Sequence, residues 1–188
     1  MNFLHRWYCR SKRWRKIVES EIVPWALEGI DFGRNILEVG PGPGLTTDVL
    51  RRRYEKMTCL EIDSKLAESL RKRMERSNVT VLHGDGAEMP FEDGSFTGAV
   101  SFTMLHHMAS ASLQDRLFRE VFRVLAPGGV FAGTDSLWSR RMVWFHLGDT
   151  MRLIDPAGLP ARLQAAGFED ARVELGDGRF KFSTRRPR

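Results

Sequence analysis

A glycine- and proline-rich segment stands where a short apolar run gives way to a helix-like pattern. Residues 36–39 read Ile-Leu-Glu-Val, residues 40–44 read Gly-Pro-Gly-Pro-Gly, and a helical pattern begins at Leu45. Glycine has no Cβ, so its backbone can approach a ligand closely and adopt a positive φ angle. A helix start also presents unpaired N–H groups and positive potential. The segment is therefore predicted to receive a carboxylate or a phosphate; the alternative is a tight turn that binds nothing.

Acidic residues follow each of the next two apolar runs. The second run ends Cys-Leu-Glu-Ile-Asp at 59–63, and an acid in this place can accept hydrogen bonds from both ribose hydroxyls of a nucleotide. Glu61 and Asp63 compete for that role, because strand alternation places both on the same side. Asp63 could instead cap the next helix. Asp85 follows the third run and is predicted to pair with an exocyclic amine such as adenine N6, unless it only stabilises a turn.

Histidines and an aspartate occupy positions from which a proton could be taken up near such a ligand. His106 and His107 follow the fourth predicted strand, and Asp135 follows the fifth. His146 lies in the next segment, with Asp149 shortly after it. Histidine titrates near neutral pH, so it can act as a general base. His106, His107, Asp135 and His146 are therefore candidate catalytic residues; the alternative is that the histidine pair hydrogen-bonds the backbone of a loop.

Alternating strands and helices are expected to position these residues. Short apolar runs bounded by turn residues predict strands, and apolar residues at spacings of three and four predict helices. The expected strands cover 36–39, 57–62, 79–82, 96–102, 130–134, 171–175 and 179–183, and the expected helices cover 45–54, 64–76, 113–125 and 159–166. This order predicts an α/β fold with a doubly wound, Rossmann-like, seven-stranded and mostly parallel sheet, with helices on both faces. A Gly-Asp-Gly turn at 176–178 joins the last two strands as a hairpin, so one strand must be antiparallel.

We predict a single domain over residues 1–188, with three parts. Residues 1–30 are expected to be helical and contain the aromatic residues Trp7, Tyr8 and Trp14; the family resemblance given below implies that this helical segment closes over the cofactor as a lid. The alternative for this basic, aromatic helix is peripheral contact with a membrane surface. Residues 35–135 would form the cofactor-binding core. Residues 136–188 would supply an acceptor-side segment and the C-terminal strands, although the segment could also be an ordinary helix packed on the sheet.

The distribution of basic residues bears on whether the protein binds nucleic acid. The chain has 29 lysines and arginines against 24 acids, a net charge of +5. The basic residues fall in runs at 12–16, 51–53, 71–73 and 185–188. No aromatic residues interleave with these runs in a recognition pattern, so we interpret them as solvated surfaces and expect no nucleic-acid partner. Attraction to nucleic acid or to an anionic membrane is the alternative.

Other sequence features bear on the compartment and on metal binding. No uninterrupted apolar run is long enough to span a bilayer, and the first residues lack the apolar region of a secretory signal. Cys9 and Cys59 show neither metal-site spacing nor a disulfide framework. We therefore expect a cytoplasmic protein without a metal site.

Four ordered motifs resemble those of class I S-adenosylmethionine-dependent methyltransferases, in particular the small-molecule branch called methyltransferase type 11 or UbiE-like. They are Glu-Val-Gly-Pro-Gly-Pro-Gly at 38–44, Leu-Glu-Ile-Asp at 60–63, Gly-Asp-Gly-Ala-Glu-Met-Pro-Phe-Glu-Asp-Gly-Ser-Phe at 84–96, and Arg-Val-Leu-Ala-Pro-Gly-Gly at 123–129. One departure is Thr97, where the family usually has Asp. The resemblance implies S-adenosyl-L-methionine as the cofactor and methyl transfer as the activity.

The resemblance also implies roles for individual residues. Gly40 and Gly42 would pass along the methionine part of the cofactor, and Glu38 would either contact its amino end or hold the loop. Glu61 would take the ribose hydroxyls. The other implied cofactor-binding residues are Pro41 and Gly44 in the loop, Ile62 against the adenine, Asp85 and Gly86 at the adenine N6, and Ser101 and Phe102 beside the methionine moiety.

Methyl transfer to a small acceptor, apolar or aromatic, is therefore the expected function. No Asn/Asp-Pro-Pro-Tyr/Phe run follows the fourth strand, as amino-methylation of bases would require, and neither cysteine is placed for pyrimidine C5 chemistry. A nicotinamide-dependent oxidoreductase is one alternative, although the Gly-x-Gly-x-Gly spacing departs from the dinucleotide fingerprint. A non-catalytic module that binds the cofactor is the other.

Overall fold

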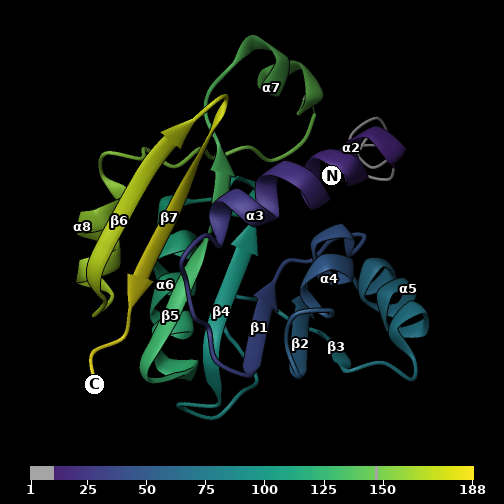
Figure 1. The fold of residues 1–188 in the computed structure, drawn as a ribbon. Helices are drawn as coiled ribbons and strands as arrows, with labels where there is room; N and C mark the ends of the chain where they lie inside the picture. The colour runs from purple at the N-terminus through teal and green to yellow at the C-terminus, as the bar shows by residue number, and fades with distance from the viewer. Residues whose placement is uncertain (1–10, 147) are drawn as a thin grey trace.

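A seven-stranded sheet forms the centre of the protein, in a computed structural model that describes residues 11–146 and 148–188 (Figure 1). The strands are β1 (Asn35–Val39), β2 (Lys56–Glu61), β3 (Val79–His83), β4 (Phe96–Phe102), β5 (Leu125–Ser136), β6 (Glu169–Gly176) and β7 (Arg179–Arg185). Strand β7 runs antiparallel to both of its neighbours, β5 and β6, while the other pairs are parallel. The predicted fold class is confirmed, including the single antiparallel strand.

The strand order places a topological switch point at β1. The order is β3-β2-β1-β4-β5-β7-β6, so the chain builds outward from β1 in one direction and then, from β4, in the other. Ile36 of β1 accordingly pairs with Met57 of β2 on one side and with Gly98 of β4 on the other. Ligands of open α/β sheets bind at the carboxyl ends of the strands beside such a point.

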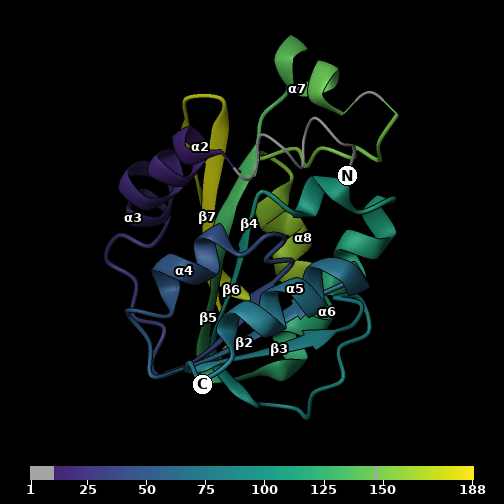
Figure 2. The same cartoon turned by 90° about the vertical axis from the view of Figure 1, so that its right-hand side faces the viewer.

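Helices cover both faces of the sheet (Figure 2). They are α2 (Lys12–Ile17), the π-helix η1 (Val18–Ile22), α3 (Val23–Ala26), α4 (Leu45–Leu50), α5 (Ser64–Met74), the short 3-10 helix η2 (Leu105–His107), α6 (Ala111–Val124), α7 (Arg140–Phe145) and α8 (Leu159–Ala165). Successive strand residues point to opposite faces. Ile36 therefore joins one core with Ile22 and Leu70, while its neighbour Leu37 joins the other with Leu117 and Leu163.

Two element boundaries differ from the sequence-based prediction by more than two residues. Helix α4 ends at Leu50 rather than at Tyr54, where the carbonyls of Arg51 and Tyr54 accept hydrogen bonds from the Asn78 side chain instead of continuing a helix. Strand β5 begins at Leu125, well before the predicted start, because an irregular register lets Leu125 pair with Phe96 of β4.

The N-terminal segment is helical from Lys12 to Ala26, as predicted for the part that the structure describes. Its middle turn is a π-helix, and Pro24 lies in the first turn of α3, where it is tolerated. Trp7, Tyr8 and Cys9 lie outside the described residues, so the predictions that involve them stay predictions. Within residues 11–146 and 148–188, none of the helices has the length and apolar content that a bilayer crossing requires.

Residues of three of the four basic runs make ion pairs within the described part of the protein. Arg15 and Arg73, which are distant in sequence, both contact the carboxylate of Asp48, and Arg71 pairs with Glu68 on the same helix. The arginines of these pairs lie on two different helices, α2 and α5, so the positive charge is not confined to one element. They agree with the interpretation of the runs as ordinary surface positions.

Candidate active site

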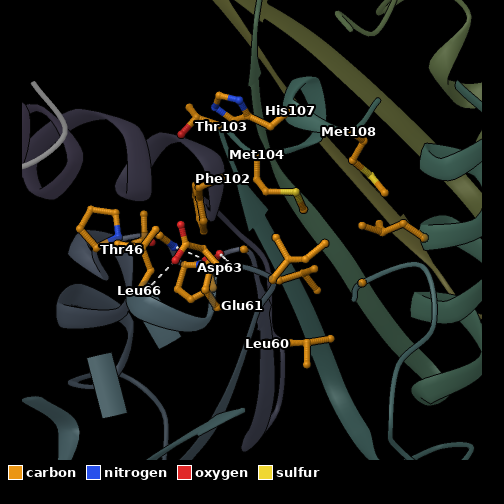
Figure 3. Close-up of a pocket in the computed structure, with 18 of the residues that line it drawn as sticks. Thr46, Leu60, Glu61, Asp63, Leu66, Phe102, Thr103, Met104, His107 and Met108 are labelled. Carbon is orange, nitrogen blue, oxygen red and sulfur yellow. Dashed lines mark hydrogen bonds between the residues drawn. The ribbon is translucent and has the colours of Figure 1, made fainter. Parts of the chain in front are cut away.

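A cavity of about 460 Å³ opens at the carboxyl edge of the sheet. Its wall is formed by the ends of β1, β2, β3 and β4 and by the N-terminal helical segment. Figure 3 shows part of this wall, in which Phe102 and Met104 lie between Glu61 and His107. The volume is typical of a site for a small molecule or cofactor.

The glycine-rich loop forms one side of the cavity. Gly40, Pro41 and Gly42 line it, and both glycines have positive φ angles, +69° and +55°. A Cβ atom added to Gly42 would have no neighbour within 4 Å, so the backbone there faces open space. Gly44 lies outside the lining and caps α4 in the left-handed conformation, where a Cβ would collide with Leu70. The loop therefore exposes bare backbone to the cavity, and its predicted role in binding a ligand stays a prediction.

Glu38 holds the loop from behind rather than reaching into the cavity. Its carboxylate is 1% exposed and accepts hydrogen bonds from the hydroxyls of Thr46 and Thr47, the latter at 2.6 Å. The Cys59 thiol is a further, weaker donor at 3.5 Å. These contacts tie β1 and β2 to the first turn of α4. Of the two roles implied for Glu38, the structure agrees with the one that fixes the loop.

Burial raises the pKa of the Glu38 carboxyl above its usual value, an effect that the hydrogen bonds from Thr46 and Thr47 oppose. Because the pKa is higher in the folded state, Glu38 makes its full contribution to the free energy of unfolding below its unfolded pKa of about 4.5. That contribution is lost as the pH rises toward the folded pKa. E38Q cannot titrate at this position. We therefore expect its free energy of unfolding to fall less than that of the wild type as the pH rises through this range. Urea unfolding of both proteins between about pH 4 and pH 7 measures the difference, and parallel curves would contradict it.

Glu61 and Asp63, which the sequence could not separate, have different tasks. Glu61 is 5% exposed, and its two carboxylate oxygens accept hydrogen bonds from the backbone N–H groups of Gly42 at 2.8 Å and Asp63 at 2.9 Å. Asp63 caps α5 by accepting from the N–H groups of Lys65 and Leu66. Both line the cavity, but only Glu61 bridges the glycine loop and the end of β2. Each Glu61 oxygen keeps a lone pair for a ligand.

The third strand end and the residue after β2 complete this half of the cavity. Asp85 and Gly86 line it, and Asp85 also accepts a hydrogen bond from the N–H of Ala87 at 2.8 Å, so it stabilises a turn while facing the cavity. Ile62 lines the cavity and is 66% exposed. An isoleucine left this open presents an apolar surface on which a flat ring could pack.

The end of β4 places one of its two predicted residues in the wall. Phe102 lines the cavity, whereas Ser101 is fully buried in the strand and takes no part in the lining. Thr103 follows with a φ of +49°, an unusual angle for a β-branched residue, and its N–H donates to the carbonyl of Thr134. Met104 and Met108 extend the wall beyond it. Sequence reasoning missed these two methionines, because an apolar side chain in a loop carries no signal of its own.

The four candidate catalytic residues lie together beside the end of the cavity that is opposite Glu61. The buried carboxylate of Asp135 accepts hydrogen bonds from His106, through Nδ1 at 2.5 Å and through the backbone N–H at 3.1 Å. The His107 ring lies 4.2 Å from that of His106 and lines the cavity, and the His146 ring lies about 5 Å from both, centroid to centroid. Asp149 lines the cavity nearby. The fold therefore joins residues that are 40 positions apart in sequence.

The environment favours the neutral form of His146. Burial lowers the pKa of its imidazole, and the neighbouring His106 acts in the same direction, while a hydrogen bond to the Met142 carbonyl at 2.8 Å opposes the shift. A neutral imidazole keeps a lone pair on one ring nitrogen. His146 can therefore accept a proton or bind a ligand at neutral pH.

A comparison with known protein families shows which family has this fold and cavity. Residues 37–133 match the family model described as a methyltransferase domain. The chain belongs to this family. The matched residues include the glycine loop, Glu61, Asp85 and His107, all of which line the cavity.

Relatives and solved structures agree with this assignment. A probable S-adenosylmethionine-dependent methyltransferase of Mycolicibacterium smegmatis is 32% identical over 143 residues, which cover 73% of this chain and 52% of that protein. A probable ribosomal RNA small subunit methyltransferase A of Thermococcus onnurineus is 38% identical over 77 residues, 41% of this chain and 27% of that protein. The chain thus spans about half, or less, of these relatives' length. The structure of a SAM-dependent methyltransferase from Aquifex aeolicus shares the fold, with a TM-score of 0.77 and 16% identity over 98% of each chain.

The family's cofactor is S-adenosylmethionine, and the residues present fit it. The cofactor has an amino-acid tail, a ribose and an adenine, and it carries a positive sulfonium. Bare backbone at Gly42, the Glu61 carboxylate, and the apolar surface of Ile62 follow one another along the wall of the methyltransferase cavity. A carboxylate with free lone pairs suits hydroxyl donors, and an open glycine suits a close backbone approach.

Proposed function

We propose that this methyltransferase domain transfers the methyl group of S-adenosylmethionine to a small acceptor, apolar or aromatic. One observation carries the proposal. The cavity brings the bare backbone of the glycine loop and the Glu61 carboxylate together with the apolar side chains of Phe102, Met104 and Met108, which border it toward His107. The loop and Glu61 suit the cofactor, and the apolar side chains suit an apolar acceptor.

The cofactor-binding roles are proposed as follows. Glu61 accepts hydrogen bonds from the ribose hydroxyls, supported by its fixed position between the loop and β2. Gly40, Pro41 and Gly42 pass along the methionine part, while Glu38 and Gly44 shape the loop without touching the ligand. The adenine end is assigned to Ile62, Asp85 and Gly86, and Phe102 borders the reacting end.

When bound, S-adenosylmethionine supplies a methyl group on a sulfonium: the acceptor's lone pair forms the new bond to carbon, and the broken bond's electrons stay on sulfur. The task of the chain is to align the acceptor and exclude water. Trp14, Val18 and Ile22 of the N-terminal helical segment line the same cavity. This supports the proposal that residues 1–30 act as a lid. Asp149 and Thr150 also line the cavity, which supports the proposal that residues 136–155 contribute to the acceptor side.

A base is needed only where the acceptor must lose a proton. His107 is the member of the histidine group that lines the cavity, so we propose it as the residue that contacts the acceptor. His106 and Asp135 lie behind it and fix its surroundings. His146 closes the group from the opposite segment.

The choice of a small molecule over an RNA rests on two supports. The side chains of Phe102, Met104 and Met108 on the acceptor side are apolar, and several arginines of the basic runs are paired with acids. A cytoplasmic location is proposed with it, supported by the free thiol of Cys59. Relatives named as ribosomal RNA methyltransferases make RNA a necessary arm of any acceptor screen.

Ligand binding tests the cofactor first. S-adenosylhomocysteine should raise the melting temperature in a concentration-dependent manner, while NAD and NADP should not, because only the first matches the spacing of the loop and Glu61. Labelled methyl transfer is then screened against phenols, quinones, lipid extracts and RNA. Stabilisation by NAD alone would favour the oxidoreductase alternative, and confirmed cofactor binding without transfer to any acceptor would favour a non-catalytic module.

For H107A we expect the turnover on an acceptor with an ionisable proton to fall by about 100-fold or more, the usual contribution of a positioned acid–base group. S-adenosylhomocysteine affinity should change little, because His107 lies at the far end of the cavity from Glu61. His83 is exposed and lies outside the cavity lining, with its Nε2 atom 3.1 Å from the Ile62 carbonyl oxygen, so H83A is the histidine control, and its S-adenosylhomocysteine affinity is measured alongside. Equal turnover in H107A and H83A would rule out the proposed contact.

A further inference from the structure

Three histidine side chains converge beside the cavity in a way that general base catalysis does not require. His106, His107 and His146 each offer a ring nitrogen, and these nitrogens all lie within 4.8 Å of one another. A tetrahedral metal ion with bonds of about 2.0–2.1 Å holds its ligand nitrogens roughly 3.4 Å apart. Small side-chain rotations would therefore bring the three nitrogens to coordination distance.

The hydrogen bonds around the cluster set the tautomers that a metal needs. The Asp135 carboxylate can only accept, so His106 donates through Nδ1 and carries its lone pair on Nε2. The Met142 carbonyl likewise makes Nδ1 of His146 the donor and places that lone pair on Nε2. Carboxylate and carbonyl groups in these positions are the usual outer shell of histidine metal ligands.

The buried nitrogen of His106 is the second, independent indication of a ligand. His106 is 2% exposed, and its Nε2 atom has no hydrogen-bond partner among the described residues. A buried acceptor without a partner is costly, and native structures rarely leave one. A cation placed between the three rings would satisfy this atom.

We propose that His106, His107 and His146 bind a divalent transition metal ion, for which Zn²⁺ is the probe. Neutral imidazoles suit zinc and its neighbours rather than magnesium or calcium, which prefer oxygen ligands. The Asp135 carboxylate, one hydrogen bond away, offsets part of the added charge. Three protein ligands leave a coordination position open, as in catalytic rather than structural zinc sites.

The location of the site gives the metal a use. His107 lines the cavity at its acceptor end, so the open position would take a water molecule or an oxygen, nitrogen or sulfur atom of the acceptor. With the metal bound, His107 would therefore act on the acceptor through the ion rather than as the base itself. A bound hydroxyl or thiol loses its proton to solvent more readily. This consequence rests on the proposed methyl transfer, whereas the metal site itself does not. His146 also belongs to the segment after α7, so the ion would tie that segment to the end of β4.

Calorimetric titration of Zn²⁺ into chelator-treated protein without an affinity tag tests the site. We expect one equivalent to bind, and we expect H146A and H107A each to weaken binding by roughly tenfold or more. The control H83A removes a histidine outside the cluster and should bind as the wild type does. Circular dichroism establishes that each variant is folded. Absence of binding by the wild type, or equal binding by H146A and H83A, would overturn the proposal.

Cobalt supplies a readout that depends on geometry. Co²⁺ in the same site should give an intense visible absorption typical of four-coordinate nitrogen ligation, which H146A should abolish; a weak six-coordinate spectrum that is unchanged in H146A would also overturn the proposal. S-adenosylhomocysteine is titrated separately into the same samples. Metal binding without cofactor binding would refute the methyl-transfer proposal alone, and the reverse result would refute the metal site alone.

Discussion

Replacing Glu61 with alanine should weaken S-adenosylhomocysteine binding by about 1–3 kcal/mol, which is roughly a 5- to 150-fold rise in the dissociation constant. Two effects act together. The ribose hydroxyls lose their acceptor, and the N–H groups of Gly42 and Asp63 lose the oxygens that hold the loop to β2. Because Glu61 is nearly buried, water restores these contacts poorly. Calorimetry with the purified wild type and E61A measures the change.

Two further variants separate these effects. E61Q keeps the size of the side chain but can present only one carbonyl oxygen, so we expect an intermediate affinity. Glu68 lies exposed on α5 and pairs with Arg71, so E68A removes an acid outside the cavity and should bind as the wild type does. An E61A dissociation constant within about twofold of that of E68A would refute the ribose assignment.

Gly133→Ala should lower the free energy of unfolding by about 3 kcal/mol or more, the largest change in stability that we predict. Gly133 pairs with Ser101 of β4 on one side and with Phe182 of β7 on the other. A Cβ there would overlap the Ser101 carbonyl oxygen and lie 2.9 Å from its carbonyl carbon. The clash is with backbone that is held in the middle of the sheet, so neither strand can easily move away. Urea denaturation of the two proteins gives the difference in unfolding free energy.

Gly158→Ala is the matched control. Gly158 precedes α8 with a φ of −83°, which any residue adopts, and an added Cβ would meet an Asp155 carboxylate oxygen at 3.2 Å and the Asp155 backbone oxygen at an ordinary 3.9 Å. We therefore expect a change of less than about 0.5 kcal/mol. Similar losses for G133A and G158A would show that the contact between β4 and β5 is looser than the structure indicates.

The strands and the glycine loop could be predicted because their signals are local. The run from Ile36 to Val39 ends in glycines, and the Gly-Asp-Gly turn before Arg179 fixes the antiparallel hairpin. Helix ends were harder to predict. The end of α4 depends on Asn78, which lies between α5 and β3 and whose side chain donates to the carbonyls of Arg51 and Tyr54.

The sequence predicted most of the residues of the site, but not the contacts that their side chains make. Alternation placed Glu61 and Asp63 on one side, yet only the structure shows Asp63 occupied with the start of α5. Ser101 was assigned to the wall from its position in the resemblance, whereas it is buried inside the sheet. His106 and His146 are separated by α6, β5 and α7, so no local pattern could show that their rings meet.

The insertion of β7 between β5 and β6 has a consequence for the order in which the protein folds. Until residues 179–185 have left the ribosome, β5 has no neighbour on one side and β6 has nothing to pair with. A nascent chain halted before that point would present the open backbone of a long, apolar strand, a surface prone to aggregation. Chaperone dependence during synthesis should therefore end abruptly when this last hairpin closes.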